Sequence, residues 1–136
     1  MSRTGSCACG AIRFTITAPF IGVGMCHCTK CQKASGGGPN YVALTPKDGL
    51  EVTQGQPSIF QSEGSSGGTI GRAFCGDCGT PLWSIPAHEP FFALKLGALD
   101  DNSDLEPEMH IYVSSAPKWH GINDDLPKFP QMPPSG

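Results

Sequence analysis

The sequence predicts an all-β fold with little helix. The chain of 136 residues contains 18 Gly and 13 Pro, too many for a helical bundle, because an interior Gly or Pro costs a helix about 1 or about 3 kcal/mol. Between residues 12 and 17 apolar and polar side chains alternate, the period-two pattern of a half-buried strand. Short apolar runs separated by Gly- and Pro-containing turns are typical of packed antiparallel sheets. The length suits a single domain over residues 1–136.

The expected elements follow one another in short steps. After the strand within 12–17, seven strand-like runs come at 41–44, 50–53, 58–61, 69–74, 82–85, 91–96 and 110–113. Breakers separate them, for example at 46–49 and at 64–68. The single helical candidate is a turn over 29–34. From Pro117 onward five prolines in twenty residues predict an extended tail that lies over the body.

Charge and hydropathy exclude several kinds of partner. Nine Lys and Arg are scattered among twelve Asp and Glu, for a net charge of −3, and this gives no basic patch for a phosphate backbone. The longest apolar runs, such as 91–94, are far shorter than the ~20 residues that cross a bilayer. The N-terminus shows no apolar signal segment. We therefore expect a cytoplasmic protein that binds neither nucleic acid nor membrane, with a homo-oligomer left open.

Seven cysteines are the most informative feature. In a reducing compartment clustered cysteines hold metal more often than they form disulfides. An odd number cannot pair completely within the chain, and Cys7 is too close in sequence to Cys9 for an unstrained bridge. The cysteines form three groups: a first pair, a trio and a second pair, namely Cys7 and Cys9; Cys26, Cys28 and Cys31; Cys75 and Cys78.

The ligand number of zinc constrains how these groups combine. Structural zinc sites have four protein ligands, whereas catalytic sites have three and keep one position open. The trio with either pair would make five ligands, which overfills a tetrahedral ion. The two pairs together make a closed site of four thiolates, and the trio makes an open site of three. We therefore expect two zinc ions per chain, one structural and one catalytic.

Other interpretations of these residues stay open at this point. The cysteines could be buried free thiols, and Cys75 and Cys78 could form a redox motif, although the βαβ pattern typical of thioredoxins is absent. His27 alternates with two trio cysteines, so it points away from their ion and lies behind it, faces substrate or lies at the surface. A distant histidine could complete the trio, the candidates being His88, His110 and His120.

Five segments together resemble a known family. GSCACGAIRF at 5–14, CHCTKCQ at 26–32 and RAFCGDCGTPL at 72–82 resemble three motifs of the glutathione-dependent formaldehyde-activating enzymes and their centromere protein V relatives. APKW at 116–119 and DDLP at 124–127 resemble the end of that domain. The similarity spans nearly the whole chain in order and fills all seven cysteine positions.

This resemblance implies a β-tent fold, in which short antiparallel sheets are joined by zinc. It implies a structural zinc on Cys7, Cys9, Cys75 and Cys78, and a second, catalytic zinc on Cys26, Cys28 and Cys31. The activity implied is a carbon–sulfur lyase reaction, the reversible addition of the glutathione thiol to formaldehyde to give S-hydroxymethylglutathione. The partners are then a small glutathione-like thiol and a small aldehyde.

This chemistry requires a thiolate near neutral pH and a polarised carbonyl, and zinc can provide both. Cations are also needed for the carboxylates of glutathione, and we expect Lys30 and Lys33 beside the trio to supply them, with Lys47, Arg72, Lys95 and Lys118 also available. Aromatic residues either line the pocket or belong to the core: Trp83, Trp119 and Phe91. Two other functions remain as alternatives, a zinc-stabilised binding module without catalytic activity and redox sensing by the trio.

Overall fold

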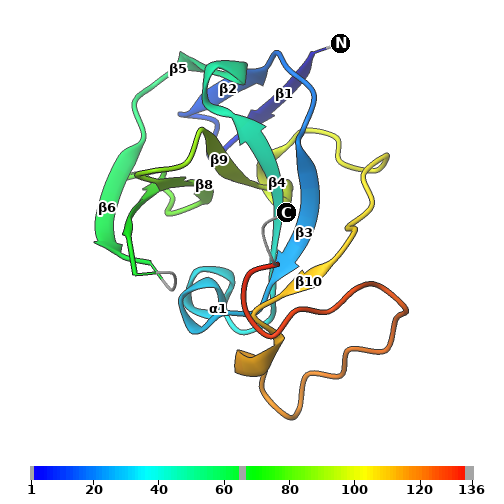
Figure 1. The fold of residues 1–136 in the computed structure, drawn as a ribbon. Coiled ribbons are helices and arrows are strands. Elements are labelled where there is room, and N and C mark those ends of the chain that lie inside the picture. Colours follow the sequence, from blue (N-terminus) through cyan, green and yellow to red (C-terminus); the bar gives the residue numbers. More distant parts are fainter. Residues whose placement is uncertain (1, 65–66, 134–136) are drawn as a thin grey trace.

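The structure of this protein is a computed structural model that describes residues 2–64 and 67–133 (Figure 1). Within these residues it is mainly β, as the sequence predicts, with one short α-helix, α1 (Thr29–Ser35), and three 3₁₀ turns at Lys47–Gly49, Leu96–Ala98 and Val113–Ser115. The strands are β1 (Arg3–Ser6), β2 (Arg13–Ile16), β3 (Gly22–Cys26), β4 (Asn40–Pro46), β5 (Leu50–Gln54), β6 (Ser58–Glu63), β7 (Thr69–Phe74), β8 (Pro81–Pro86), β9 (Phe91–Lys95) and β10 (His110–Ile111).

Every expected strand has a counterpart, and two strands were not predicted. These are β1, which is polar, and β3, in which Gly22 and Gly24 alternate with buried Val23 and Met25. The expected helical turn is α1, one residue longer than predicted. Residues 65 and 66 of the predicted turn at 64–68, and the last three residues of the predicted tail, lie outside the described residues.

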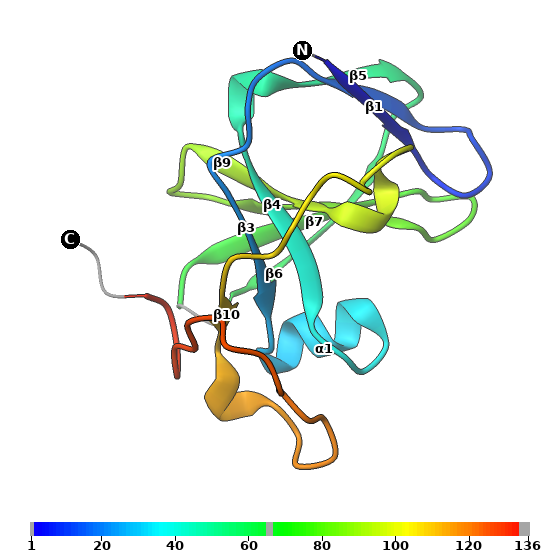
Figure 2. The ribbon, with the colours of Figure 1, turned by 90° about the vertical axis from the view of Figure 1, so that its right-hand side faces the viewer.

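The strands form two sheets. The small sheet has the order β1-β2-β5, and the large sheet has the order β10-β3-β4-β9-β8-β7-β6. Pairing is antiparallel except between β10 and β3, which run parallel. Figure 1 shows the large sheet curving from β6 through β8 and β9 to β3, and in Figures 1 and 2 the small sheet and α1 lie toward opposite ends of it.

The core lies between the small sheet and one face of the large sheet. Phe14 and Ile16 of β2 are both 1% exposed, and the Phe14 ring meets Trp83 of β8 edge to face at a centroid distance of 5.4 Å. Because side chains alternate along a strand, Ala43 and Leu94 enter this core, and the residues beside them face the opposite side of the large sheet. That opposite face carries the site described below.

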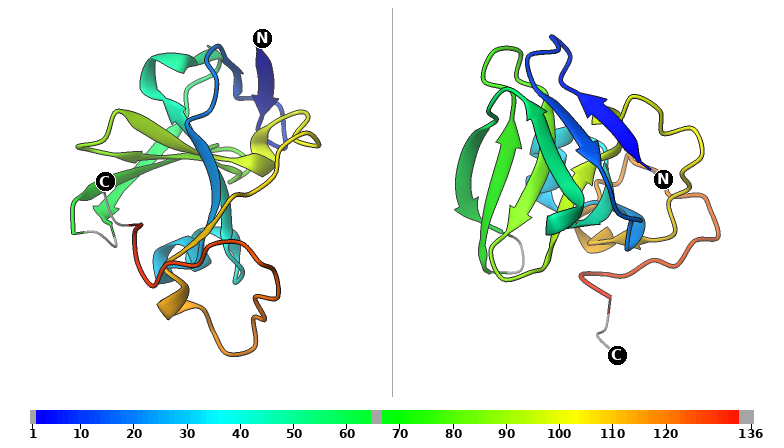
Figure 3. Two further views of the ribbon diagram at one scale, coloured as in Figure 1. Left: turned by 45° about the vertical axis from the view of Figure 1, so that its right-hand side comes forward. Right: turned by 90° about the horizontal axis from the view of Figure 1, so that it is seen from above.

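The C-terminal segment packs against β10. The backbone N–H of His110 donates to Pro127 at 2.9 Å, and the N–H of Phe129 donates back to His110 at 2.9 Å. Figure 3 shows this segment looping away from the body and returning beside β10. Among the described residues, none of the helices is long and apolar enough to cross a membrane.

Candidate metal centres

The four-cysteine cluster consists of Cys7, Cys9, Cys75 and Cys78, whose sulfur atoms lie within 4.8 Å of one another. The first pair lies in the turn after β1 and the second in the turn between β7 and β8. A glycine follows each pair: Gly10 has a φ of 79° and Gly79 a φ of 78°, a left-handed conformation that is costly for residues with a Cβ. These glycines let each turn fold back tightly under its two sulfurs.

The spacing of these sulfurs fits a tetrahedral zinc ion. The Cys9 sulfur lies 3.7 Å from that of Cys7 and 3.8 Å from that of Cys75. A Zn–S bond of about 2.3 Å places neighbouring ligands of a tetrahedron about 3.8 Å apart. Backbone N–H groups also donate to sulfur, from Ile12 to Cys7 at 3.2 Å and from Cys78 to Cys75 at 3.5 Å. Such bonds stabilise thiolates, the form that binds metal.

Electrostatics within this cluster favour a cation at its centre. The Thr80 hydroxyl, 3.1 Å from the Cys78 sulfur, and neighbouring N–H groups lower the pKa of Cys78 to about 5. The Ala11 N–H favours the Cys9 thiolate, but the neighbouring cysteine sulfurs outweigh it and raise the pKa of Cys9 to about 12. Negative charge on one sulfur therefore opposes charge on the next. A bound cation removes this repulsion and lets all four ionise together.

The three-cysteine cluster is built from six consecutive residues. Cys26 ends β3, Cys28 is the N-cap of α1 and Cys31 lies in its first turn. The Cys28 sulfur accepts the N–H of Cys31 at 3.3 Å, and the three sulfurs lie within 4.8 Å of one another. The sulfurs of Cys28 and Cys31, together with burial, raise the pKa of Cys26. This donor set also fits zinc, with one position left for another ligand.

No histidine joins the three-cysteine cluster among the described residues. His110 uses one ring nitrogen to contact Nε2 of His27 at 2.8 Å and the other to contact the Asp124 carboxylate, also at 2.8 Å. A carboxylate only accepts, so Nε2 of His110 donates to it, and Nδ1 of His110 then accepts from His27. His27 is 1% exposed, so the surface alternative for this residue is wrong.

Gln32 is a positioning residue that the sequence did not reveal. Its side-chain amide donates to the carbonyl of His27 at 2.8 Å and to that of Ser115 at 2.9 Å. It thus ties the cysteine loop to the segment that follows β10. The glutamine stands directly after Cys31, but its partner 83 residues away is set by the tertiary fold alone.

The three-cysteine cluster opens into a cavity of about 350 Å³ on the far face of the large sheet from the core. Its walls are mostly apolar, from β3, β4, β7, β8 and β9, and the segment from Met132 to Pro133 also borders it. Two cations line it, Arg72 of β7 and Lys95 of β9, with Ser84 of β8 between them. The four-cysteine cluster does not line this cavity.

The structure thus changes which cations belong to the site. Lys30 and Lys33, expected beside the carboxylates, lie on α1 and are not among the residues that line the cavity. Lys95 is 8% exposed, and burial lowers its pKa to about 8, partly opposed by the sulfur of Cys31. Of the three aromatic candidates, Phe91 lines the cavity, Trp83 is in the core and Trp119 is 73% exposed.

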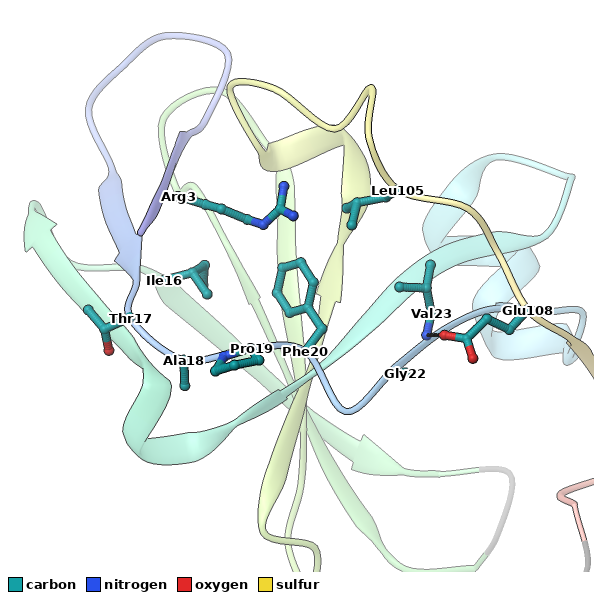
Figure 4. Close-up of a pocket in the computed structure, with 10 residues that line it drawn as sticks. All are labelled: Arg3, Ile16, Thr17, Ala18, Pro19, Phe20, Gly22, Val23, Leu105 and Glu108. Atoms are coloured by element: carbon teal, nitrogen blue, oxygen red, sulfur yellow. Dashed lines mark hydrogen bonds between the residues drawn. The ribbon is translucent and has the colours of Figure 1, made fainter. Parts of the chain in front are cut away.

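A second cavity of about 330 Å³ lies beside β2 and the start of β3 (Figure 4). Its charged side chains already have partners. Arg3 pairs with Asp104 at 2.7 Å and lies over the Phe20 ring, and Glu108 accepts the N–H of Val23 at 3.1 Å. No cysteine lines this cavity, so we assign the candidate site to the first.

Fold and site together define a class: a small, mainly β protein with two cysteine clusters suited to zinc, one joining two sheets and the other open to a cavity. The chain belongs to the family of glutathione-dependent formaldehyde-activating enzymes, whose sequence profile matches residues 2–115.

Individual relatives agree with this family. A Halomonas elongata protein, provisionally named a glutathione-dependent formaldehyde-activating enzyme, is 31% identical over 125 residues, or 88% of this chain and 80% of its own. A Penicillium rubens protein of the same provisional name is 30% identical over 113 residues, 80% of this chain but 58% of its own length. A Rhodobacter sphaeroides crystal structure shares the fold, with a TM-score of 0.58, 20% identity and coverage of 74% of this chain and 91% of that one.

Proposed function

We propose that this protein is a zinc-dependent enzyme that adds the thiol of glutathione reversibly to formaldehyde, a carbon–sulfur lyase in the reverse direction. The family and the names of its relatives support the substrates. The observation that carries the proposal is that the three-cysteine cluster borders a mostly apolar cavity of about 350 Å³, a size typical of small-ligand sites. An enzyme site needs such a space for two reactants.

We assign a structural or a catalytic role to each metal from the position of its cysteine cluster, between the sheets or beside the cavity. Cys7, Cys9, Cys75 and Cys78 would hold a structural zinc, and Cys26, Cys28 and Cys31 would hold the catalytic zinc. When bound to three thiolates, zinc supplies a Lewis-acidic position that favours the ionised form of a thiol and can polarise an oxygen. All seven cysteines are free of disulfide bonds in the structure, which suits both sites.

The chain itself contributes positioning and exclusion of water. The apolar walls lower the local dielectric, which strengthens the interaction of any charge in the cavity with Arg72 and Lys95. In the forward reaction the thiol loses its proton and the sulfur forms a bond to the carbonyl carbon, while the carbon–oxygen double bond becomes single and the oxygen gains a proton. In the reverse reaction the hydroxyl loses its proton, the carbonyl double bond forms again, and the sulfur leaves with the electrons of the carbon–sulfur bond and regains a proton.

The direct test is the exchange rate between free formaldehyde and S-hydroxymethylglutathione, measured by NMR with ¹³C-formaldehyde. We expect zinc-loaded protein to accelerate exchange above the uncatalysed rate, and Cys31→Ser to remove the acceleration. Exchange at the uncatalysed rate with a zinc-loaded, folded protein would contradict the enzyme and favour the binding module.

A further inference from the structure

The two cations of the cavity are arranged around one hydroxyl. Nη1 of Arg72 and Nζ of Lys95 each donate to Oγ of Ser84, both at 3.3 Å. In the described part of the chain neither cation forms an ion pair with a carboxylate. Lys95 and Ser84 are buried, at 8% and 3% exposure. Ser84 is neutral and cannot compensate the charge of the buried Lys95 or of the half-buried Arg72. A buried charge without a counter-charge is costly, so an anion that binds between these two side chains would be stabilised.

Strand register places this group beside the three-cysteine cluster. Lys95 pairs with Val42 of β4, and Val42 pairs with Gly24 of β3, two residues before Cys26. Residues two apart on a strand share a face, so Gly24 and Cys26 border the same cavity as Lys95. With strands about 4.8 Å apart, Lys95 stands about 10 Å from Gly24 across the sheet. Arg72 pairs with Ser84 and lies one strand beyond it.

Between the cations and the cysteines this face of the sheet is apolar, and Val42 lies between Lys95 and Gly24. Gly22 and Gly24 leave β3 without side chains along this face. A Cβ at Gly22 would meet no atom within 4 Å, whereas one at Gly24 would contact Met109 at 3.4 Å. Beyond them Ala93 and Leu44 add only small or apolar groups. A flexible ligand can therefore lie along the sheet with its sulfur at the cysteines and an anionic group at the cations.

We propose that Arg72, Lys95 and Ser84 form a carboxylate-binding subsite, which selects thiols that carry a carboxylate a few bonds from the sulfur. This inference rests on the proposed function and names the feature of the thiol that the site recognises. Arg and Lys form charge-assisted hydrogen bonds with a carboxylate, and Ser84 holds both cations in place before the ligand arrives. Arg72 and Lys95 therefore determine which thiol binds, and they take no part in the bond changes at sulfur.

The test compares glutathione with its diamide, in which carboxamides of similar size replace both carboxylates. Affinities are measured by calorimetry on zinc-loaded protein. We expect the wild type to bind glutathione at least about tenfold more tightly than the diamide, since a hydrogen bond to a charged group is worth about one to two powers of ten. Lys95→Met and Arg72→Gln should each weaken glutathione roughly tenfold to hundredfold and leave the diamide nearly unchanged.

Matched variants distinguish the loss of a positive charge from a general disruption of the site. Lys95→Arg and Arg72→Lys keep the charge and should retain part of the preference for glutathione, whereas Lys118→Met, an exposed lysine outside the cavity, should change neither affinity. Equal wild-type affinity for the two thiols would overturn the subsite. Equal losses for both thiols in Lys95→Met and Arg72→Gln would also overturn it, because the cations would then act on the cysteine cluster itself.

A second measurement distinguishes this failure from failure of the proposed function. Cobalt in place of zinc gives sulfur-to-metal absorption bands that change when a further thiolate binds. If glutathione outbinds its diamide but leaves these bands unchanged, the subsite stands and the thiol mechanism fails. If both thiols change the bands with equal affinity, the mechanism stands and the subsite fails. No binding of either thiol overturns both.

Discussion

The two cysteine clusters share one ligand chemistry but differ in how the chain builds them. The four-cysteine cluster joins turns that are 66 residues apart between Cys9 and Cys75, and it links the small sheet to the large one. The three-cysteine cluster comes from residues 26–31 alone, with each ligand placed by the end of β3 or the start of α1. One cluster lies between sheets, and the other borders a cavity.

This difference leads us to expect that the four-cysteine cluster serves the stability of the fold and the three-cysteine cluster serves the reaction. Closing a loop of more than sixty residues costs about 4 kcal/mol in chain entropy, and a structural zinc supplies roughly 10–16 kcal/mol of apparent binding free energy. A metal bound in the four-cysteine cluster would therefore stabilise the whole fold. The three-cysteine cluster closes only a short loop, so a metal bound there would contribute less to folding and would be available for binding a ligand.

The largest expected effect follows from breaking the four-cysteine cluster. Cys78→Ser should give unfolded or insoluble protein, because roughly 10 kcal/mol of metal binding is comparable to the total stability of a typical domain, about 5–15 kcal/mol. Circular dichroism and the soluble yield measure this. A folded Cys78→Ser protein with an intact β signal would show that this cluster is not the structural one.

Breaking the other cluster should affect activity and spare the fold. Cys31→Ser should stay folded, with a melting temperature within a few degrees of the wild type, while activity falls by about 10²-fold or more, beyond the 10- to 100-fold typical of losing a group behind a metal ligand. The two serine variants are each other's control, since they make the same atomic change. Exchanged phenotypes would mean that the structural and catalytic assignments are reversed.

Stepwise removal of metal tests the same distinction without mutation. A mild chelator should first remove the metal of the three-cysteine cluster, which borders the cavity, and the β signal should persist. The second metal should leave only as the protein unfolds, because its site exists only in the folded state. Metal release and circular dichroism are followed together. Simultaneous loss of both metals and of the β signal would contradict unequal sites.

Cysteine spacing and the coordination number of zinc together predicted which cysteines cluster, because coordination number is a chemical constraint that does not depend on the fold. Most strands were also predictable from short apolar runs between breakers. β1 and β3 were missed for a physical reason: their stability comes from tertiary contacts. Gly5 of β1 faces the Phe14 ring so closely that a Cβ would clash at 2.3 Å, and β3 gives one face to glycines beside the cavity.

The cations of the site could not be predicted for a related reason. Nearness in sequence favoured Lys30, which lies between two of the cysteines, and Lys33, two residues after the last of them. Both lysines lie on α1, but neither side chain lines the cavity. Arg72 and Lys95 converge only because β7, β8 and β9 are neighbours in register. The contact between His27 and His110, 83 residues apart, likewise depends on the parallel pairing of β10 with β3.

The smallest expected effect concerns the segment behind the three-cysteine cluster. The hydrogen bond from His110, with help from the Leu126 N–H and Lys128, holds the pKa of Asp124 below its usual value. A carboxyl whose folded pKa is lowered stabilises the fold above its unfolded pKa, about 3.9, and this contribution is lost as the pH falls through the folded pKa. Asp124→Asn should therefore loosen the segment at pH 6, and its difference from the wild type should begin to shrink as the pH falls below the unfolded pKa, about 3.9.

Hydrogen exchange of the His110 and Phe129 amides measures this locally, because both bond across this segment. In Asp124→Asn they should exchange faster than in the wild type at pH 6, and the difference should shrink on acidification. Asp125→Asn is the matched control, since it removes the neighbouring charge without touching His110, and it should leave both amides protected. Equal exchange in all three proteins at pH 6 would mean that Asp124 does not hold this segment in place. His110, and His27 which it contacts behind the cysteine loop, would then have to be held in place by packing alone.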